Sequence, residues 1–129
     1  MANIILIVVD DEEDIQVLFE MQFRKEIKSD IVELHCLRSG KLAMEFLQNH
    51  PLKENGMMLV DINMPGMNGL ELLKIVKEQY PQIPVFMITA YNNAQNLREA
   101  YQYGADDFIG KPIDFVSLKQ KILRYFMSH

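Results

Sequence analysis

Three aspartates, one threonine and one lysine stand where apolar stretches of this sequence end. Asp10 and Asp11 follow Ile4–Val9, Asp61 follows a second such stretch, and Thr89 and Lys111 follow two more. If these stretches are parallel strands, their carboxyl ends lie along one edge of a sheet, where open α/β folds bind ligands. We therefore expect the five side chains to converge, although they are far apart in the sequence.

The three carboxylates of this group require a counter-charge. Two carboxylates 4 Å apart repel by about 4 kcal/mol at an effective dielectric constant near 20. Oxygen ligands that leave room for water and phosphate favour Mg²⁺, or Mn²⁺ in its place, over zinc. An ordinary acidic first turn of a helix is a sufficient explanation for Glu12, Glu13 and Asp14. It does not explain why Asp61, Thr89 and Lys111 stand at the ends of other strands.

The segment after Asp61 carries the most specific signal. Pro65, Gly66 and Gly69 predict an irregular loop before the next helix, which exposes the aspartate at the strand end. A carboxylate beside a divalent ion and a lysine can act as a nucleophile towards phosphorus. In this interpretation the metal and Lys111 neutralise the phosphoryl oxygens while Asp61 attacks in line.

The elements that must position these residues are predicted from hydrophobic periodicity. Segments with one apolar face at helical spacing alternate with the apolar stretches, and the first such face contains Ile15, Leu18, Phe19 and Phe23. Five strands alternating with five helices predict an α/β fold with a parallel sheet. The predicted strands are Ile4–Val9, Val32–Leu37, Met57–Val60, Val85–Ile88 and Phe108–Ile109. Because polar Glu33 and His35 alternate with apolar residues in the second strand, it is expected to be a half-exposed edge strand.

Composition limits the class of protein. With 129 residues, 49% of them apolar, the chain is expected to form a single domain over 1–129. The net charge of −5 disfavours direct binding to nucleic acid. The single cysteine, Cys36, fits a reducing cytoplasm and a place in the core. Ile4–Val9 is too short to insert into a membrane.

Taken together, these motifs make the chain resemble the receiver domain of bacterial two-component response regulators, from about Asn3 to Met127. The matching pieces are Val8–Asp11, the Asp61 loop with Met64, Pro65 and Gly69, the pair Thr89–Ala90, the segment Gly104–Asp107, and Phe108–Pro112. The resemblance implies a flavodoxin-like, doubly wound (βα)5 fold with a five-stranded parallel sheet of order 2-1-3-4-5.

The resemblance also implies roles for single residues. Asp61 would accept a phosphoryl group from the phosphohistidine of a histidine kinase or a histidine phosphotransfer protein. Asp11 and Asp61 would bind Mg²⁺ directly, Asp10 mainly through water, and Asn63 through its backbone carbonyl. Lys111 would pair with the phosphoryl group, and its bond to Pro112 would be cis, against a base rate of about 5% for such bonds.

The implied switch begins when the Thr89 hydroxyl moves onto the phosphoryl group, after which Phe108 turns from exposed to buried. The face formed by the fourth predicted helix, the last strand and the last helix would then change and bind a downstream protein target or output domain. Asn63 and Tyr91 would tune dephosphorylation in opposite directions. Such a protein is a regulatory switch rather than an enzyme, and a monomer or a weak, phosphorylation-dependent dimer.

Other functions compete with this interpretation. A Mg²⁺-dependent phosphohydrolase of the haloacid-dehalogenase kind would place its nucleophile after the first strand, whereas here the candidate lies on the third. A flavin-binding flavodoxin would not place Asp10–Asp14 at its phosphate loop. A receiver that has lost phosphorylation would not keep the complete set of acids, threonine and lysine. Because no output domain is expected after the last helix, the chain would be a stand-alone regulator, a relay intermediate or a receiver cut from a longer protein.

Overall fold

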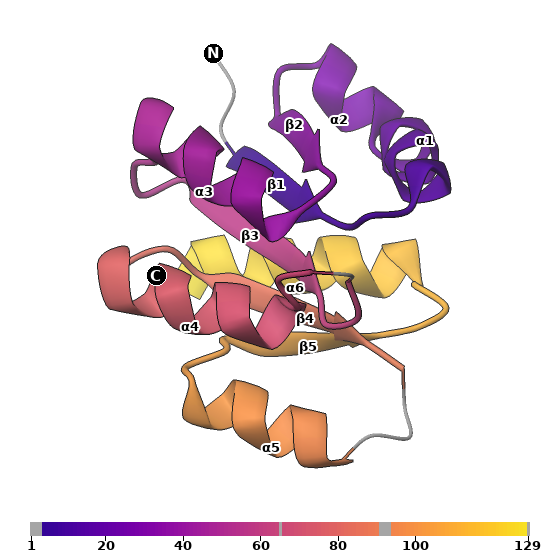
Figure 1. The fold of residues 1–129 in the computed structure, drawn as a ribbon. Helices are drawn as coiled ribbons and strands as arrows, with labels where there is room; N and C mark the ends of the chain where they lie inside the picture. The colour runs from indigo at the N-terminus through magenta and orange to yellow at the C-terminus, as the bar shows by residue number, and fades with distance from the viewer. Residues whose placement is uncertain (1–3, 65, 91–93, 129) are drawn as a thin grey trace.

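The computed structural model describes residues 4–64, 66–90 and 94–128. They form a five-stranded parallel sheet with helices on both faces (Figure 1). The strands are β1 (Ile4–Val9), β2 (Val32–Leu37), β3 (Gly56–Asp61), β4 (Val85–Thr89) and β5 (Asp107–Gly110). The helices are α1 (Glu13–Gln22), α2 (Arg24–Lys28), α3 (Gly40–Asn49), α4 (Gly69–Gln79), α5 (Ala94–Gln102) and α6 (Phe115–Ser128). The strand order β2-β1-β3-β4-β5 confirms the predicted fold class.

The central strands are apolar because helices cover both of their sides. Every residue of β3 and β4 is buried, including the polar residues at their last positions, Asp61 and Thr89. Both strands are longer than predicted at this end, since these two residues still belong to the ladder. The sheet therefore delivers the two polar side chains to the same edge.

The strand β2 is the exposed edge that its alternating pattern predicts. The His35 side chain lies on this edge, with its Nε2 2.6 Å from Glu33 Oε2 and its ring centroid 4.7 Å from that of Phe46. Cys36 is half-buried rather than fully enclosed, and burial raises the pKa of its thiol to about 11. The neutral thiol is the form that this site favours.

The sheet separates two apolar clusters. One lies under α3, α4 and α5 and includes Ile7, Val60 and Met87. The other lies under α1, α2 and α6 and includes Val8, Leu59 and Ile88. Because neighbouring residues of a strand point to opposite faces, each strand contributes to both clusters.

The first helical segment differs from the prediction of a single helix with one buried stripe. It is divided at Phe23 into α1 and α2, so the described residues contain one helix more than expected. Phe19 and Phe23 are buried against Phe115 of α6, with ring centroids 5.1 and 6.3 Å from the Phe115 ring. Leu18 is 36% exposed, so its assignment to the buried stripe was wrong. The bulky aromatic rings fill the space between α1 and α6 and leave Leu18 at the margin.

The helices differ in how firmly they are packed. In α4, five residues are buried, whereas in α5 only Ala100 is. Among the described residues, no helix has the length and apolar character needed to cross a membrane.

Candidate functional site

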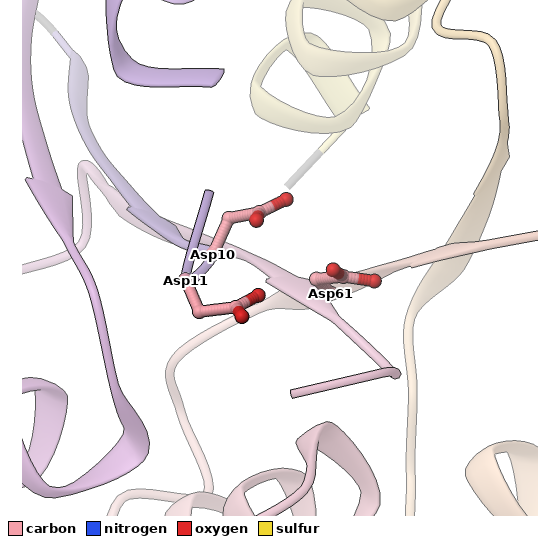
Figure 2. A group of neighbouring side chains, drawn as sticks. All are labelled: Asp10, Asp11 and Asp61. Carbon is pink, nitrogen blue, oxygen red and sulfur yellow. The ribbon is translucent and has the colours of Figure 1, made fainter. Parts of the chain in front are cut away.

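Three carboxylates meet at the carboxyl edge of the sheet. Asp10 and Asp11 follow β1, and Asp61 is the last residue of the neighbouring strand β3, where Val9 pairs with Val60. Figure 2 shows the three side chains beside one another at these strand ends. One oxygen from each lies within 4.8 Å of the other two. The predicted convergence of the three aspartates therefore occurs in the structure.

The environment of Asp10 is unfavourable for a negative charge. Its side chain is 5% exposed, and Oδ1 accepts a hydrogen bond of 2.9 Å from the Glu12 backbone N–H. Its Oδ2 is buried and has no hydrogen-bond partner among the residues that the structure describes. Burial raises the pKa of Asp10 to about 6, and the Asp61 charge adds to this rise, while the Glu12 N–H and Lys111 oppose it. An additional positive charge at this edge would stabilise the ionised carboxylate of Asp10.

Lys111 supplies one such charge beside Asp61. Its Nζ lies 3.2 Å from Oδ1 of Asp61, whose side chain is only 1% exposed. The Lys111 backbone N–H donates a 3.0 Å hydrogen bond to the Thr89 carbonyl, which fixes the lysine beside the end of β4. The peptide bond between Lys111 and Pro112 is cis, the isomer that the resemblance implies.

Thr89 and Phe108 lie on the face of the sheet that α3, α4 and α5 cover, opposite the face that α6 covers. Thr89 is buried, and its hydroxyl donates a 3.0 Å hydrogen bond to the Ala90 carbonyl. Phe108 pairs in register with Met87 and packs against the cluster under α3, α4 and α5. It is half-buried, between the two positions that the predicted switch requires. Tyr91, the other residue predicted near this place, lies outside the described residues.

The loop between β3 and α4 holds Asp61 through its backbone. The Asn63 N–H donates a 3.2 Å hydrogen bond to Asp61 Oδ1, while the Asn63 side chain is exposed. Gly66 has a φ of 74°, a conformation that favours glycine. A Cβ atom on Gly69 would overlap the Asp61 carbonyl oxygen, so the chain can close this loop only with glycine there.

One supporting residue of this loop was missed by sequence reasoning. The Asn68 side chain caps α4 by accepting a 2.9 Å hydrogen bond from the Glu71 N–H. The signal was present, because Asn followed three residues later by Glu is typical of a helix start. Beside this loop lies an open hollow of about 360 Å³, lined by Ile62, Asn63, Met64, Asn68, Leu70 and Asn96. Asp61 does not line this hollow, and its side chain is 1% exposed, so the prediction that the loop exposes this carboxylate to solvent was wrong.

Comparison with known proteins agrees with this geometry. The family model described as the response regulator receiver domain matches residues 6–123. The DNA-binding transcriptional regulator NtrC of Proteus hauseri is 38% identical over 107 residues, which is 83% of this chain and 21% of the relative. The response regulator PilR of Pseudomonas aeruginosa is 34% identical over 116 residues, 90% of this chain and 24% of the relative. The heme response regulator HssR of Staphylococcus epidermidis is 32% identical over 117 residues, 91% of this chain and 48% of the relative.

Solved structures show the same fold. The receiver domain of NtrX from Brucella abortus matches with a TM-score of 0.81 and 28% identity, covering 96% of this chain and 99% of that one. The receiver domain of the Francisella response regulator 1452 matches with a TM-score of 0.81 and 25% identity, covering 98% of each chain.

The family model, the curated relatives and the solved structures point to the same protein family. The chain spans less than half the length of the three curated relatives named above. The family model, in contrast, covers nearly all of the chain, including the three carboxylates, Thr89 and Lys111. The chain therefore belongs to the response regulator receiver domain family of two-component signalling.

Proposed function

We propose that this receiver domain is a switch that accepts a phosphoryl group on Asp61 from the phosphohistidine of a histidine kinase or histidine phosphotransfer protein. The observation that carries this proposal is the convergence of Asp10, Asp11 and Asp61, with the Lys111 ammonium 3.2 Å from the Asp61 carboxylate. Asp61 is held at the end of β3 by a loop that requires glycine at position 69. These are the properties that a phospho-acceptor needs.

The residues present fit a hard divalent cation. The buried Oδ2 of Asp10 has no hydrogen-bond partner among the described residues, and three carboxylates within 4.8 Å repel by about 3.5 kcal/mol per pair at a dielectric constant of 20. Asp10, Asp11, Asp61 and the backbone carbonyl of Asn63 would hold Mg²⁺, or Mn²⁺ in its place. When bound, the ion neutralises negative charge on the phosphoryl oxygens.

In the proposed reaction a carboxylate oxygen of Asp61 forms a bond to phosphorus as the bond between phosphorus and the donor histidine breaks. The histidine nitrogen leaves with the bonding electron pair, and the imidazole takes up a proton from solvent. The Lys111 ammonium is close enough to move from the Asp61 carboxylate to an oxygen of the transferred group. Asn63 and Tyr91 would then set how quickly water removes the phosphoryl group.

The switch would work through Thr89 and Phe108. Val85, Met87 and Thr89 alternate along β4 and share one face, the face on which Phe108 packs beside Met87. If the Thr89 hydroxyl leaves the Ala90 carbonyl for a phosphoryl oxygen, space opens on the same face as Phe108. The face formed by α5, β5 and α6 would change, and this is where we place the downstream target or output domain.

The proposal also covers the domain organisation of the chain, its location in the cell and the partners it does not bind. Residues 1–129 would act as a single receiver domain in the cytoplasm, without direct contact to nucleic acid or insertion into a membrane. The acidic net charge supports the statement on nucleic acid. Its role would be signalling, and its chemistry would be limited to its own phosphorylation and dephosphorylation.

The test is phosphorylation by a small-molecule phosphodonor in the presence of Mg²⁺. Intact-mass measurement should show the gain of one phosphoryl group, and peptide mapping should locate it on Asp61. The variant Asp61→Asn should gain none, while Asp14→Asn, which removes an exposed carboxylate outside the cluster, should behave as the wild type. Label on Thr89 or on a histidine would refute the proposed acceptor.

A further inference from the structure

An apolar pocket opens at the end of the sheet opposite the three carboxylates. It has a volume of about 190 Å³ and lies between α2, the start of β2 and α6, and we call it the amino-end pocket. Ile4 and Val32, which line it, are the first residues of β1 and β2, whereas Asp10 follows the last residue of β1. The pocket therefore lies at the far end of β1 from the proposed acceptor, and the proposed function does not use it.

The lining of the amino-end pocket consists of six apolar and two charged side chains. Four of the apolar side chains belong to the core and are at most 6% exposed: Ile4, Phe23, Val32 and Ile122. The other two form the outer part of the pocket, where Leu123 is 52% exposed and Ile31 is 40% exposed. An apolar molecule that displaces water from such a surface gains free energy.

The two charged side chains form an ion pair whose lysine is fully engaged. The Lys119 Nζ of α6 lies 3.0 Å from Glu26 Oε2 of α2 and donates a 2.6 Å hydrogen bond to the Gln22 carbonyl. It also lies 5.1 Å from the centre of the Phe23 ring. Glu26 Oε1, in contrast, is buried without a hydrogen-bond partner in the part of the chain that the structure describes. The unused capacity of the pair is therefore that of an acceptor.

The charges around Glu26 decide which kind of donor suits it. Burial alone would raise the pKa of Glu26, but the hydrogen bond from Lys119 and the charges of Lys119 and Lys25 hold it below its ordinary value. The carboxylate is ionised at neutral pH and already has two lysines near it. An additional ammonium group would be repelled by these lysines, and an additional carboxylate would be repelled by Glu26. A neutral N–H or O–H group is subject to neither repulsion.

We infer that the amino-end pocket binds a small, uncharged apolar molecule with one hydrogen-bond donor, which is directed to the Glu26 carboxylate. The volume sets the size of this molecule. Apolar cavities of about 150 Å³ bind benzene, so 190 Å³ suits one ring or two fused rings. Stable protein interfaces bury about 1,200 Å² or more, far beyond what this pocket and its two exposed apolar side chains offer. A small molecule is therefore the occupant that fits.

Indole has the required chemistry, because its two fused rings carry a single neutral N–H. Indene is the matched probe, since it has the same fused-ring shape and no N–H. A ligand of about nine non-hydrogen atoms in a partly open pocket binds modestly, and we expect a dissociation constant on the order of 100 µM for indole. Indene should bind about tenfold more weakly, because it leaves the ionised acceptor without a donor.

The first experiment titrates the unphosphorylated full chain with each probe and follows the backbone amide NMR signals. Indole should shift, in a saturable way, the signals of residues 23–26, 31–32 and 119–123, and it should leave those of Asp11, Asp61 and Lys111 in place. Indole that shifts no signals at the pocket, or indene that binds as tightly as indole, overturns the inference. Signals of these residues that move with protein concentration and not with the probe would show a contact between copies, which also overturns it.

The second experiment tests the two parts of the pocket with variants. Glu26→Met removes the acceptor while Lys119 keeps the Gln22 carbonyl as a partner, so this variant should bind indole and indene equally. Leu123→Asp places a charge in the outer part of the pocket and should weaken both probes about fivefold or more. The matched control is Met127→Asp, because Met127 is 84% exposed on the same helix and does not line the pocket.

The control should leave both dissociation constants unchanged. A preference for indole that survives in Glu26→Met, or probes that bind Leu123→Asp as tightly as the wild type, would refute the proposed site. Because neither experiment involves phosphorylation, failure here leaves the proposed function untouched.

Discussion

Replacing Asp10 by asparagine removes one of three crowded carboxylates without changing the size of the side chain. The asparagine keeps an oxygen that can accept the hydrogen bond from the Glu12 N–H. In the wild type, burial first and the Asp61 charge second raise the pKa of Asp10 from 3.8 to about 6. A rise of this size corresponds to about 3 kcal/mol of unfavourable free energy for the ionised group at neutral pH. We expect Asp10→Asn to increase the free energy of unfolding by about 1–3 kcal/mol at pH 7 in the presence of a chelator.

The sign of the pH dependence follows from the direction of the shift. Because the folded-state pKa lies above 3.8, the folded wild type binds more protons than the unfolded chain between about pH 4 and pH 6. Its stability therefore falls as the pH rises through this window, and this loss is absent from Asp10→Asn. The advantage of the variant should be greatest near neutral pH and should vanish below about pH 4, where Asp10 is protonated in both states.

The assay is urea unfolding of wild type and variant at several pH values, with chelator and with Mg²⁺. An ion that binds only the folded state adds about 2.7 kcal/mol at a concentration one hundred times its dissociation constant, and we expect the variant to gain less than the wild type. The control Asp14→Asn should have the same free energy of unfolding as the wild type in chelator. Mg²⁺ should also stabilise it as much as it stabilises the wild type. A variant that is less stable than the wild type in chelator at pH 7, or a gain equal at pH 4 and pH 7, would refute the reasoning.

Three further predictions concern the loop, the lysine and the switch. Gly69→Ala should cost about 3 kcal/mol or more in urea unfolding because its Cβ overlaps the Asp61 carbonyl, whereas Gly66→Ala, with open space and only a positive φ, should cost about 1 kcal/mol. Lys111→Ala should keep the far-ultraviolet circular dichroism spectrum and bind Mg²⁺, but phosphorylation should no longer move the Phe108 amide signal; an unchanged response would remove Lys111 from the coupling. A phosphoryl mimic at Asp61 should shift amide NMR signals mainly in residues 90–103 and 108–115, and shifts concentrated in residues 32–47 would place the output elsewhere.

The sequence was sufficient to predict the elements whose burial leaves a periodic trace. Ile4–Val9 is apolar throughout and forms a strand covered on both faces, and Val32–Leu37 alternates and forms the edge. Asp61 was expected at the edge of the sheet because a polar residue ended an apolar run. These predictions depend on local pattern alone, which is why they are correct to within a residue or two.

The features that were missed depend on contacts between distant segments. No glycine or proline marks the division of the first helix at Phe23, which accompanies the packing of Phe19 and Phe23 on Phe115. The exposure of Leu18 has the same origin, since a periodic pattern cannot say which of two adjacent apolar residues the rest of the chain will cover. The distance between Lys111 and Asp61 likewise requires the complete sheet.

The thin packing of α5 has a consequence for how such a protein can diversify. Only Ala100 of this helix is buried, so its other positions contribute little to the apolar core, and changes there carry a small penalty in folding. Mutations on this helix can therefore accumulate under selection for new binding partners, while α4, with five buried residues, is constrained by the core. A library that randomises the exposed positions Ala94, Gln95, Arg98, Tyr101 and Gln102 should yield many folded members that differ in what they bind. The same number of random changes at the buried positions of α4 should yield almost none.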